Sequence, residues 1–281
     1  MKLLLIHTGG TIGMVPTPDG LAPQAGMVEG ALEAMLPAGI TLIRHIFDPL
    51  LDSADVGPSQ WNILLNVIRS HPETPVIVTH GSDTMSFTGA ALSQALAGEG
   101  RRVVLCGSMK PLGQNADAEG NLALAIGTAL APGAGVFLAF ADKLLPAAGL
   151  VKHDSQAEDA FCSQPQAPLG PAQSRLFSDK RLGILSLSPG MDGAFLAAAI
   201  DALDGAVLRV FGSGTAMSDP AVLSALATAV SGGKRVRAVS QCEAGGLEPG
   251  AYAAGAGLWA AGVENGGAET PEAALIHLWL N

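Results

Sequence analysis

Residues 75–97 read PVIVTHGSDTMSFTGAALSQALA, and this stretch decides the fold class of the chain. Its first part, Pro75–His80, is a short apolar run that predicts a buried strand. The segment from Met85 to Ala97 predicts a helix, and the polar residues between them predict a loop. A strand that passes through a polar loop into a helix is the repeating unit of parallel α/β folds.

The same unit recurs on both sides of this stretch. Continuous apolar strands that alternate with helices predict a parallel sheet covered on both faces, with right-handed crossovers. Proline is favoured in the first turn of a helix, which suits a helix that begins at Pro58. The other predicted elements of this half are strands at Leu3–Ile6, Ile40–Phe47, Arg102–Gly107 and Val136–Phe140, and helices at 58–70 and from about Asp117.

A second, smaller α/β unit follows a linker. Residues 163–174 contain three prolines and show no periodicity, which favours a linker. Beyond it, apolar runs again alternate with helical segments, the last of them at Pro271–Leu280. We therefore expect an N-terminal α/β catalytic domain at 1–162, a linker at 163–182 and a C-terminal α/β domain at 183–281.

Composition and charge limit the class of protein. The chain has 281 residues, 48% of them hydrophobic and 14% charged, which excludes a disordered protein. Its net charge of −10 argues against a nucleic-acid partner, because phosphate binding needs a basic patch. Cys106, Cys162 and Cys242 are odd in number and widely spaced, so we expect reduced thiols in a cytoplasmic protein rather than disulfides or a zinc site.

One uncharged stretch, Leu122–Ala141, has the length of a membrane span. Pro132 and Gly133 divide it near the middle, so it predicts a helix followed by a buried strand. The apolar run at Leu3–Ile6 is too short for a signal peptide. We expect no contact with a membrane.

Polar loops follow four successive predicted strands. They are Thr8–Thr11, Asp52–Asp55, His80–Thr84 and Gly107–Lys110. The carboxyl ends of parallel strands meet at one edge of a sheet, where ligands bind. Hydroxyls, carboxylates and glycine amides are therefore expected to face one crevice.

The first of these loops matches no nucleotide-binding motif. Thr8 stands where a dinucleotide fingerprint has its first glycine, and Pro16 and Pro18 oppose a following helix. No lysine lies near Thr11, which excludes a Walker loop. A G-x-S-x-G elbow is absent as well, since Ser82 stands in HGSD.

The remaining possibility is a hydroxyl nucleophile that works without a histidine. His80 is expected to serve as a structural hydrogen-bonding group rather than as a base. A threonine hydroxyl needs an activating neighbour, for which Ser82, Asp83 and a lysine are candidates. Asp83 could anchor a substrate ammonium or hold that lysine in place. A lysine acts as a base where burial lowers its pKa.

The loops also carry a family resemblance. The segments HTGGTIGM (7–14), VTHGSDTM (78–85) and LCGSMKPLGQNADAEGNLALA (105–125) resemble the signatures of the bacterial-type L-asparaginases. The stretch at 240–263 resembles the C-terminal domain of the cytosolic type I branch. The resemblance implies a two-domain fold, with a flavodoxin-like parallel sheet first and a smaller Rossmann-like α/β domain second. It implies hydrolysis of L-asparagine to L-aspartate and ammonia without metal or cofactor, in a cytoplasmic homodimer or homotetramer.

The resemblance also implies roles for particular residues. Thr11 matches the nucleophile that forms an acyl-enzyme, and Lys152, in GLVKHDS, falls where the family has its catalytic lysine. Ser82 stands in place of a second threonine, and Asp83 matches the aspartate that follows. Ser53 matches the serine that holds the substrate's carboxylate. The implied catalytic set is Thr11, Ser82, Asp83 and Lys152, and the implied substrate-binding set is Gly10, Asp52, Ser53, Ala54, Ser82 and Asp83.

Leu21 departs from the family pattern, because the lid loop after the first signature normally carries a tyrosine near the nucleophile. A sensor homologue that binds an amino acid with little turnover is therefore one alternative. A glutaminase-asparaginase with relaxed specificity is another, since the two substrates differ by one methylene group.

Overall fold

The computed structural model describes residues 1–18, 20–114 and 116–281, and it divides into two compact units. The N-terminal unit comprises Met1–Ser163 and Leu169–Ala172, and the C-terminal unit comprises Gln164–Pro168 and Gln173–Asn281. Residues 164–181 form neither helix nor strand, as the prolines predict. The domain limits that we set from the sequence stay a prediction.

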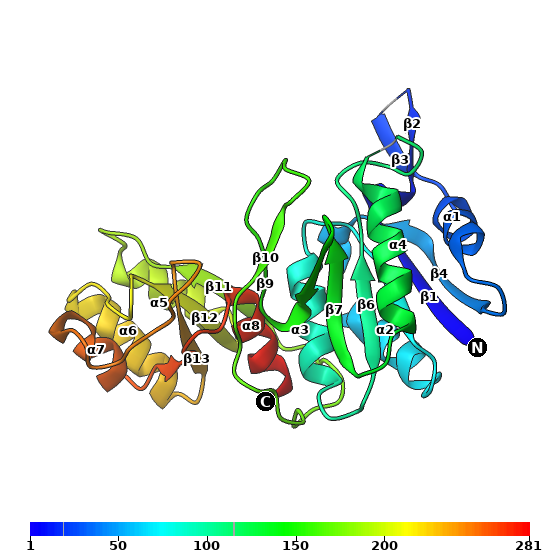
Figure 1. Cartoon of the computed structure of the whole chain (residues 1–281). Coiled ribbons are helices and arrows are strands. Elements are labelled where there is room, and N and C mark those ends of the chain that lie inside the picture. The colour runs from blue at the N-terminus through cyan, green and yellow to red at the C-terminus, as the bar shows by residue number, and fades with distance from the viewer. Residues whose placement is uncertain (19, 115) are drawn as a thin grey trace. The chain divides into compact units, whose positions relative to one another are not determined.

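The N-terminal unit is built on a six-stranded sheet in the order β4-β1-β5-β6-β7-β8 (Figure 1). The first five strands are parallel, which confirms the predicted parallel sheet. β8 is antiparallel to β7 and closes the edge, a feature that the sequence did not predict. The strands are β1 (Lys2–Gly9), β4 (Thr41–Leu51), β5 (Val76–Thr79), β6 (Arg102–Cys106), β7 (Gly135–Phe140) and β8 (Lys143–Pro146).

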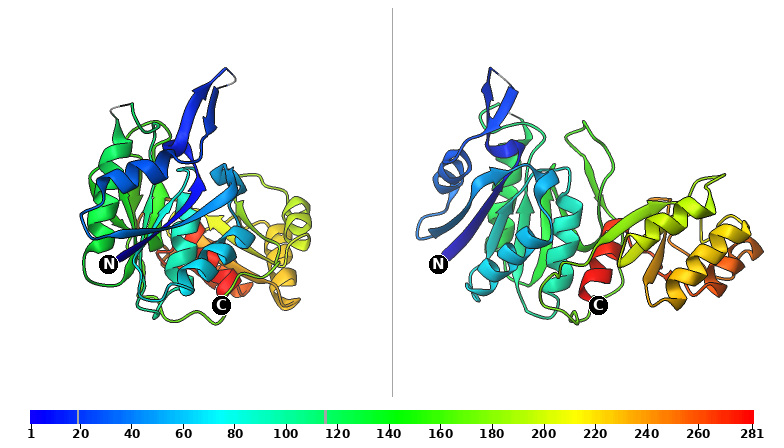
Figure 2. Two further views of the ribbon diagram at one scale, coloured as in Figure 1. Left: turned by 90° about the vertical axis from the view of Figure 1, so that its right-hand side faces the viewer. Right: turned by 180° about the vertical axis from the view of Figure 1, so that it is seen from behind.

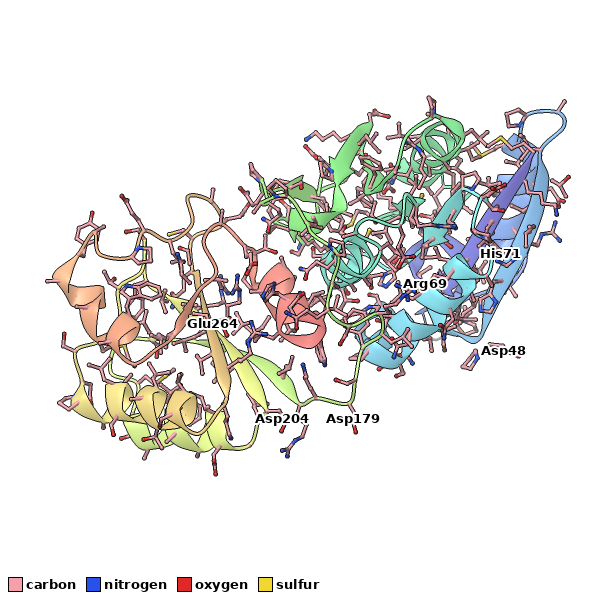
Figure 3. The ribbon with its side chains drawn as sticks, turned by 90° about the horizontal axis from the view of Figure 1, so that it is seen from below. Asp48, Arg69, His71, Asp179, Asp204 and Glu264 are labelled. Atoms are coloured by element: carbon pink, nitrogen blue, oxygen red, sulfur yellow. The ribbon has the colours of Figure 1, made fainter. Side chains whose placement is uncertain are left out.

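Helices cover both faces of this sheet. α1 (Met27–Met35) and α4 (Asp117–Leu130) pack on one face, where Val28 and Leu122 join a buried cluster with Leu3 and Leu5 of β1. α2 (Pro58–Arg69) and α3 (Met85–Ala95) cover the other face (Figure 2). Within that layer, Arg69 of α2 binds Glu99 beyond α3 with Nη2 2.7 Å from Oε1 (Arg69 is labelled in Figure 3).

The uncharged stretch at Leu122–Ala141 divides as predicted, since α4 ends at Leu130 and β7 begins at Gly135. No helix in the described part of the chain is long and apolar enough to cross a membrane.

Several short elements accompany the sheet of the N-terminal unit. A β2–β3 hairpin (Met14–Thr17 and Gly20–Pro23) follows β1. β9 (Leu150–Lys152) pairs antiparallel with β10 (Phe161–Ser163). Three single turns of 3₁₀ helix complete the set: η1 (Thr11–Gly13), η2 (Ser53–Asp55) and η3 (Ala147–Gly149). None of these elements was predicted, because each is too short to carry a periodic pattern.

The C-terminal unit has its own four-stranded parallel sheet, in the order β11-β12-β13-β14. Leu208 and Val210 of β12 form its core with Leu196 and Leu226 of the helices. Its elements are β11 (Leu182–Ser186), α5 (Gly193–Asp201), β12 (Gly205–Val210), α6 (Pro220–Ser231), β13 (Arg235–Ser240), η4 (Ala253–Gly255), α7 (Ala256–Ala260), β14 (Glu264–Asn265) and α8 (Pro271–Leu280).

Candidate active site

Two glycines bring three polar loops into contact at the carboxyl edge of the sheet. Gly10 has a φ of 90°, and a Cβ atom built on it would lie 2.5 Å from Cα of Gly81. A Cβ atom on Gly81 would lie 2.8 Å from Oγ of Ser53. Only glycine allows this approach, because any side chain would collide with the neighbouring backbone. The loops after β1, β4 and β5 therefore meet as the strand order predicts.

Thr11 and Ser82 each follow one of these touching glycines. Thr11 is half-buried and opens η1, whose next residue, Ile12, is fully buried. The Ile12 carbonyl accepts a hydrogen bond from the backbone of Leu112, which ties the loop after β6 to the same place. Ser82 is 9% exposed.

Lys152 lies between Ser82 and Asp83. Its Nζ is 2.9 Å from Oγ of Ser82 and 2.6 Å from Oδ1 of Asp83. The Lys152 side chain is 15% exposed and that of Asp83 is 71% exposed. Two roles were considered for Asp83, and the structure shows one of them: its carboxylate holds the lysine. Among the described residues, no hydrogen bond joins the hydroxyl of Thr11 to this group.

Ser53 is the buried member of the loop after β4. It is 4% exposed, and its carbonyl accepts a hydrogen bond from the hydroxyl of Thr84. Asp52 caps η2, since its Oδ1 accepts a hydrogen bond of 2.9 Å from the amide of Ala54. The predicted second strand ended at Phe47, which was wrong. β4 continues to Leu51, so that Asp52 directly follows the strand.

Asp117 and Asn121 fix the loop after β6, although sequence reasoning gave them no role. Asp117 accepts hydrogen bonds from the amides of Met109 (2.7 Å) and Lys110 (3.1 Å). Asn121 donates to the carbonyl of Gly107 at 2.9 Å. The two lie four residues apart on α4 and so share one face of the helix, a spacing that could have pointed to them.

Two buried histidines lie beneath the crevice. Burial lowers the pKa of His80 to about 4, against weaker opposing effects of the Gly81 carbonyl and the Asp52 carboxylate. Burial also lowers the pKa of His7, and the Glu29 carboxylate opposes that shift. His7 Nδ1 lies 2.7 Å from Oγ1 of Thr79. Both rings are neutral near pH 7, and His80 is a structural hydrogen-bonding group as expected.

Leu21 lies in β3, opposite Pro16 in the β2–β3 hairpin. Its side chain is 49% exposed. The hairpin follows η1 directly, so it is the element through which position 21 could reach Thr11.

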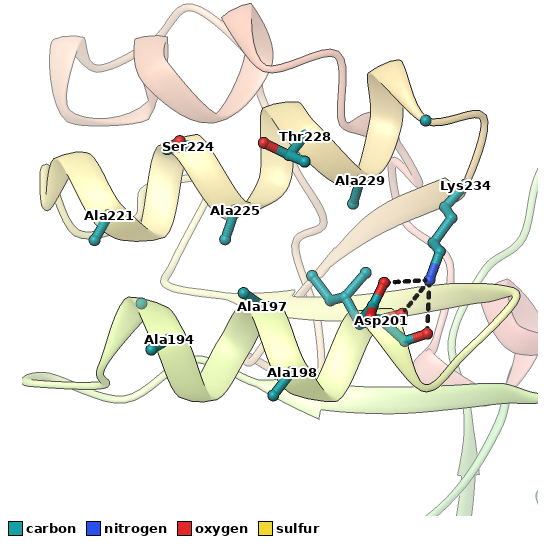
Figure 4. A pocket seen from close by; sticks show the side chains of 13 residues that line it. Ala194, Ala197, Ala198, Asp201, Ala221, Ser224, Ala225, Thr228, Ala229 and Lys234 are labelled. Atoms are coloured by element: carbon teal, nitrogen blue, oxygen red, sulfur yellow. Dashed lines mark hydrogen bonds and ion pairs between the residues drawn. The ribbon is translucent and has the colours of Figure 1, made fainter.

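A groove of about 820 Å³ lies within the C-terminal unit, between α5 and α6 (Figure 4). Six of its thirteen lining residues are alanine, and Lys234 is held by Asp201 and by the carbonyl of Ile200. Such a surface offers no nucleophile with an adjacent base, so the groove is a poor candidate for catalysis.

Comparisons with known proteins agree with the geometry. Residues 2–181 match the family "Asparaginase, N-terminal", and residues 181–281 match "Glutaminase/Asparaginase C-terminal domain". The chain is 30% identical to L-asparaginase 1 of Escherichia coli K12, over 99% of this chain and 90% of that protein.

Solved structures give the same result. The thermostable L-asparaginase from Thermococcus kodakarensis superposes with a TM-score of 0.87 at 28% identity, covering 100% of this chain and 92% of that one. L-asparaginase I from Vibrio cholerae superposes with a TM-score of 0.86 at 27% identity, covering 99% and 92%. The two-domain α/β fold expected from the sequence is confirmed.

Proposed function

Because this chain belongs to the asparaginase family, we propose that it hydrolyses the side-chain amide of L-asparagine through an acyl-enzyme formed on Thr11. The chain is an amidohydrolase, and its reaction converts L-asparagine to L-aspartate and ammonia. The observation that carries the mechanism is Lys152, which lies within hydrogen-bonding distance of both Ser82 and Asp83 beside the loop that bears Thr11.

In the first step, the hydroxyl oxygen of Thr11 attacks the amide carbon, and its proton passes toward Ser82 and Lys152. Collapse of the tetrahedral intermediate breaks the carbon–nitrogen bond, and ammonia leaves with the added proton. Water then attacks the ester on Thr11 and releases L-aspartate. Asp83 keeps Lys152 in place throughout, as their distance of 2.6 Å supports.

The substrate's charged groups are held by the neighbouring loops. We assign the α-carboxylate to Ser53, with Asp52, Ala54 and Gly10 beside it, and the α-ammonium to the exposed carboxylate of Asp83. The close packing of Ser53 against Gly81 supports a rigid seat, which supplies the positioning that amide hydrolysis needs.

Two narrower questions are open to experiment. One methylene separates asparagine from glutamine, so discrimination between them is worth about 1–3 kcal/mol in a shaped pocket. Leu21 favours the other alternative, a low-turnover sensor, because it removes the usual lid tyrosine.

The test is ammonia release by the purified chain with asparagine, glutamine, their D-isomers and no substrate. We expect release from L-asparagine above the blank. Thr11→Ala should abolish turnover while L-asparagine still raises the melting temperature. Thr41→Ala is the matched control, since Thr41 is exposed at the opposite end of the sheet. An active Thr11→Ala variant would refute the nucleophile, and a thermal shift without turnover in the native chain would identify a sensor.

We further propose a cytoplasmic homodimer or homotetramer that needs no metal or cofactor. Sedimentation should give a mass two or four times the 28.3 kDa of one chain. Dialysis against EDTA should leave the rate unchanged, because the proposed groups are hydroxyls, a lysine and a carboxylate. A monomeric mass or a chelator-sensitive rate would contradict these assignments.

A further inference from the structure

A buried chain of hydrogen bonds ends at the backbone of the candidate site. Nδ1 of His80 lies 2.7 Å from the Gly81 carbonyl oxygen, and Nε2 lies 2.9 Å from Oγ1 of Thr88 on α3. Nε1 of Trp61, on α2, donates to the same Oγ1 at 3.0 Å. His80 and Thr88 are fully buried and Trp61 is 3% exposed. Two helices thus support a single imidazole ring beneath the loop.

Donor and acceptor chemistry fixes the direction of each of these hydrogen bonds. The Gly81 carbonyl can only accept, so Nδ1 of His80 carries a proton. The ring is neutral because burial lowers its pKa to about 4, so Nε2 accepts. The hydroxyl of Thr88 therefore donates to His80, and its oxygen accepts from the indole N–H of Trp61, which is a donor only. Each atom has a suitable partner in only this arrangement.

The hydrogen bond from Nδ1 of His80 to the Gly81 carbonyl orients the peptide group between Gly81 and Ser82. A trans peptide directs its C=O and N–H in opposite directions. Since His80 holds the C=O on the buried side, the N–H of Ser82 faces the other way. Within the described residues this N–H has no acceptor. Gly10, the residue before Thr11, packs directly against Gly81.

We propose that His80 is a positioning residue, which holds the Gly81–Ser82 peptide so that the N–H of Ser82 stabilises the oxyanion formed when Thr11 attacks. This inference rests on the proposed function. His80 does not touch the substrate. Its Nδ1–H sets the direction of the peptide, while Thr88 and Trp61 keep the ring in the required tautomer.

The kinetic test compares variants that differ in one bond. His80→Leu removes the donor to Gly81, and we expect kcat to fall about 100-fold, near the lower end for loss of an oxyanion donor. His80→Asn places an amide N–H close to the position of Nδ1. Its kcat should therefore be at least about tenfold higher than that of His80→Leu. KM should change by less than about threefold in both, because the substrate's charged groups bind elsewhere.

Two further variants test the support of the ring. Thr88→Val should lower kcat about tenfold, and Trp61→Phe by less, because Thr88 can still donate to His80 without Trp61. Thr128→Val is the matched control. Thr128 is also a buried helical threonine, but it lies on α4 and takes no part in the hydrogen bonds that support His80. The variant should keep kcat within about twofold of the native chain.

A spectroscopic test does not depend on turnover. Nitrogen-15 spectra of the imidazole should show His80 as the Nδ1–H tautomer near pH 7, although free histidine side chains favour Nε2–H. The Nε2–H tautomer would overturn the proposal even if every variant folded poorly.

The outcomes separate the inference from the function. If the native chain releases ammonia but His80→Leu and His80→Asn have equal kcat, the ring only fills space and the inference is wrong. If Thr88→Val behaves like Thr128→Val, the proposed support is wrong. A native chain that hydrolyses no amide would overturn the function and this inference with it.

Discussion

The proposed catalytic role of Asp83 can be separated from its contribution to stability. Its side chain is mostly exposed, and an ion pair in water contributes little to folding, typically about 0–1 kcal/mol. The same carboxylate holds the lysine of the proposed proton relay. We therefore predict that Asp83 contributes little to the stability of the fold and much to the proposed reaction.

Asp83→Asn is therefore expected to change the free energy of unfolding by less than about 1 kcal/mol. It should lower kcat/KM at least about 100-fold, because the lysine and the substrate's ammonium both lose a charged partner. Denaturant titration and ammonia release measure the two effects. Asp159→Asn is the control, since Lys143 lies 2.6 Å from Asp159 in another ion pair with an exposed carboxylate. Comparable loss of activity in both variants would argue against a special role for Asp83.

His80 makes stability depend on pH in the acidic range. Its pKa is lowered from 6.5 to about 4 in the folded chain, so between these values the unfolded chain binds a proton that the folded chain does not. The free energy of unfolding should therefore fall as pH drops through this window, by at most about 1.4 kcal/mol per unit.

The pH dependence of the free energy of unfolding should be compared between the native chain and His80→Asn, because the difference isolates the contribution of His80. Burial also lowers the pKa of His7 and His277, which adds slope of the same sign, and raises that of Glu272, which adds the opposite sign. These contributions are common to both chains. Urea titrations at several pH values between 4 and 7 should show a steeper decline in the native chain. Equal slopes would mean that His80 titrates normally.

Much of the site could be predicted at the level of single residues, and the reason is the parallel sheet. Thr11, Ser53 and Ser82 come together because their loops follow neighbouring strands at one edge. The supporting roles of Thr88 and Trp61 could not be read from the sequence. Each lies on the buried side of a helix, where a polar group looks like any other core position until its partner is known.

At the scale of elements, periodicity predicted the long helices and the buried strands. α3 and β5 follow directly from residues 75–97. The sequence did not reveal α1, the β2–β3 hairpin, the β9–β10 pair and β8 in the N-terminal unit, or α7 and β14 in the C-terminal unit. Most of these elements are short or lie at an edge of a sheet. Lys152 belongs to β9, so its place beside Ser82 depends on the pairing of two three-residue strands, which carries no periodic signal.

The β2–β3 hairpin gives a prediction of its own. Leu21 is half-exposed in β3, and tyrosine fits a strand position well, so Leu21→Tyr should fold with little cost. If the missing phenol limits turnover, kcat should rise while KM changes little, as measured by ammonia release. Leu21→Phe is the control, because it adds the ring without the hydroxyl. An unchanged or lower rate in Leu21→Tyr would show that this site orients Thr11 by other means.

At the scale of the whole molecule, each unit has its own parallel sheet and its own hydrophobic core. The sequence predicted this organisation from the proline-rich interruption of the strand–helix pattern. What it could not predict is that Leu169–Ala172 groups with the first unit, since four residues without periodicity carry no signal about the unit they contact.

Separate cores predict that damage stays local. Leu208 is fully buried in the core of the C-terminal unit, so Leu208→Ala should destabilise that unit by about 2–5 kcal/mol. Hydrogen exchange should then rise within residues 173–281 while residues 1–163 keep their protection, because units with independent cores need not open together. Leu5→Ala, which makes the same change in the N-terminal core, should give the opposite pattern. Equal loss of protection in both units from either variant would show that the chain unfolds as one cooperative body, with each core dependent on the other.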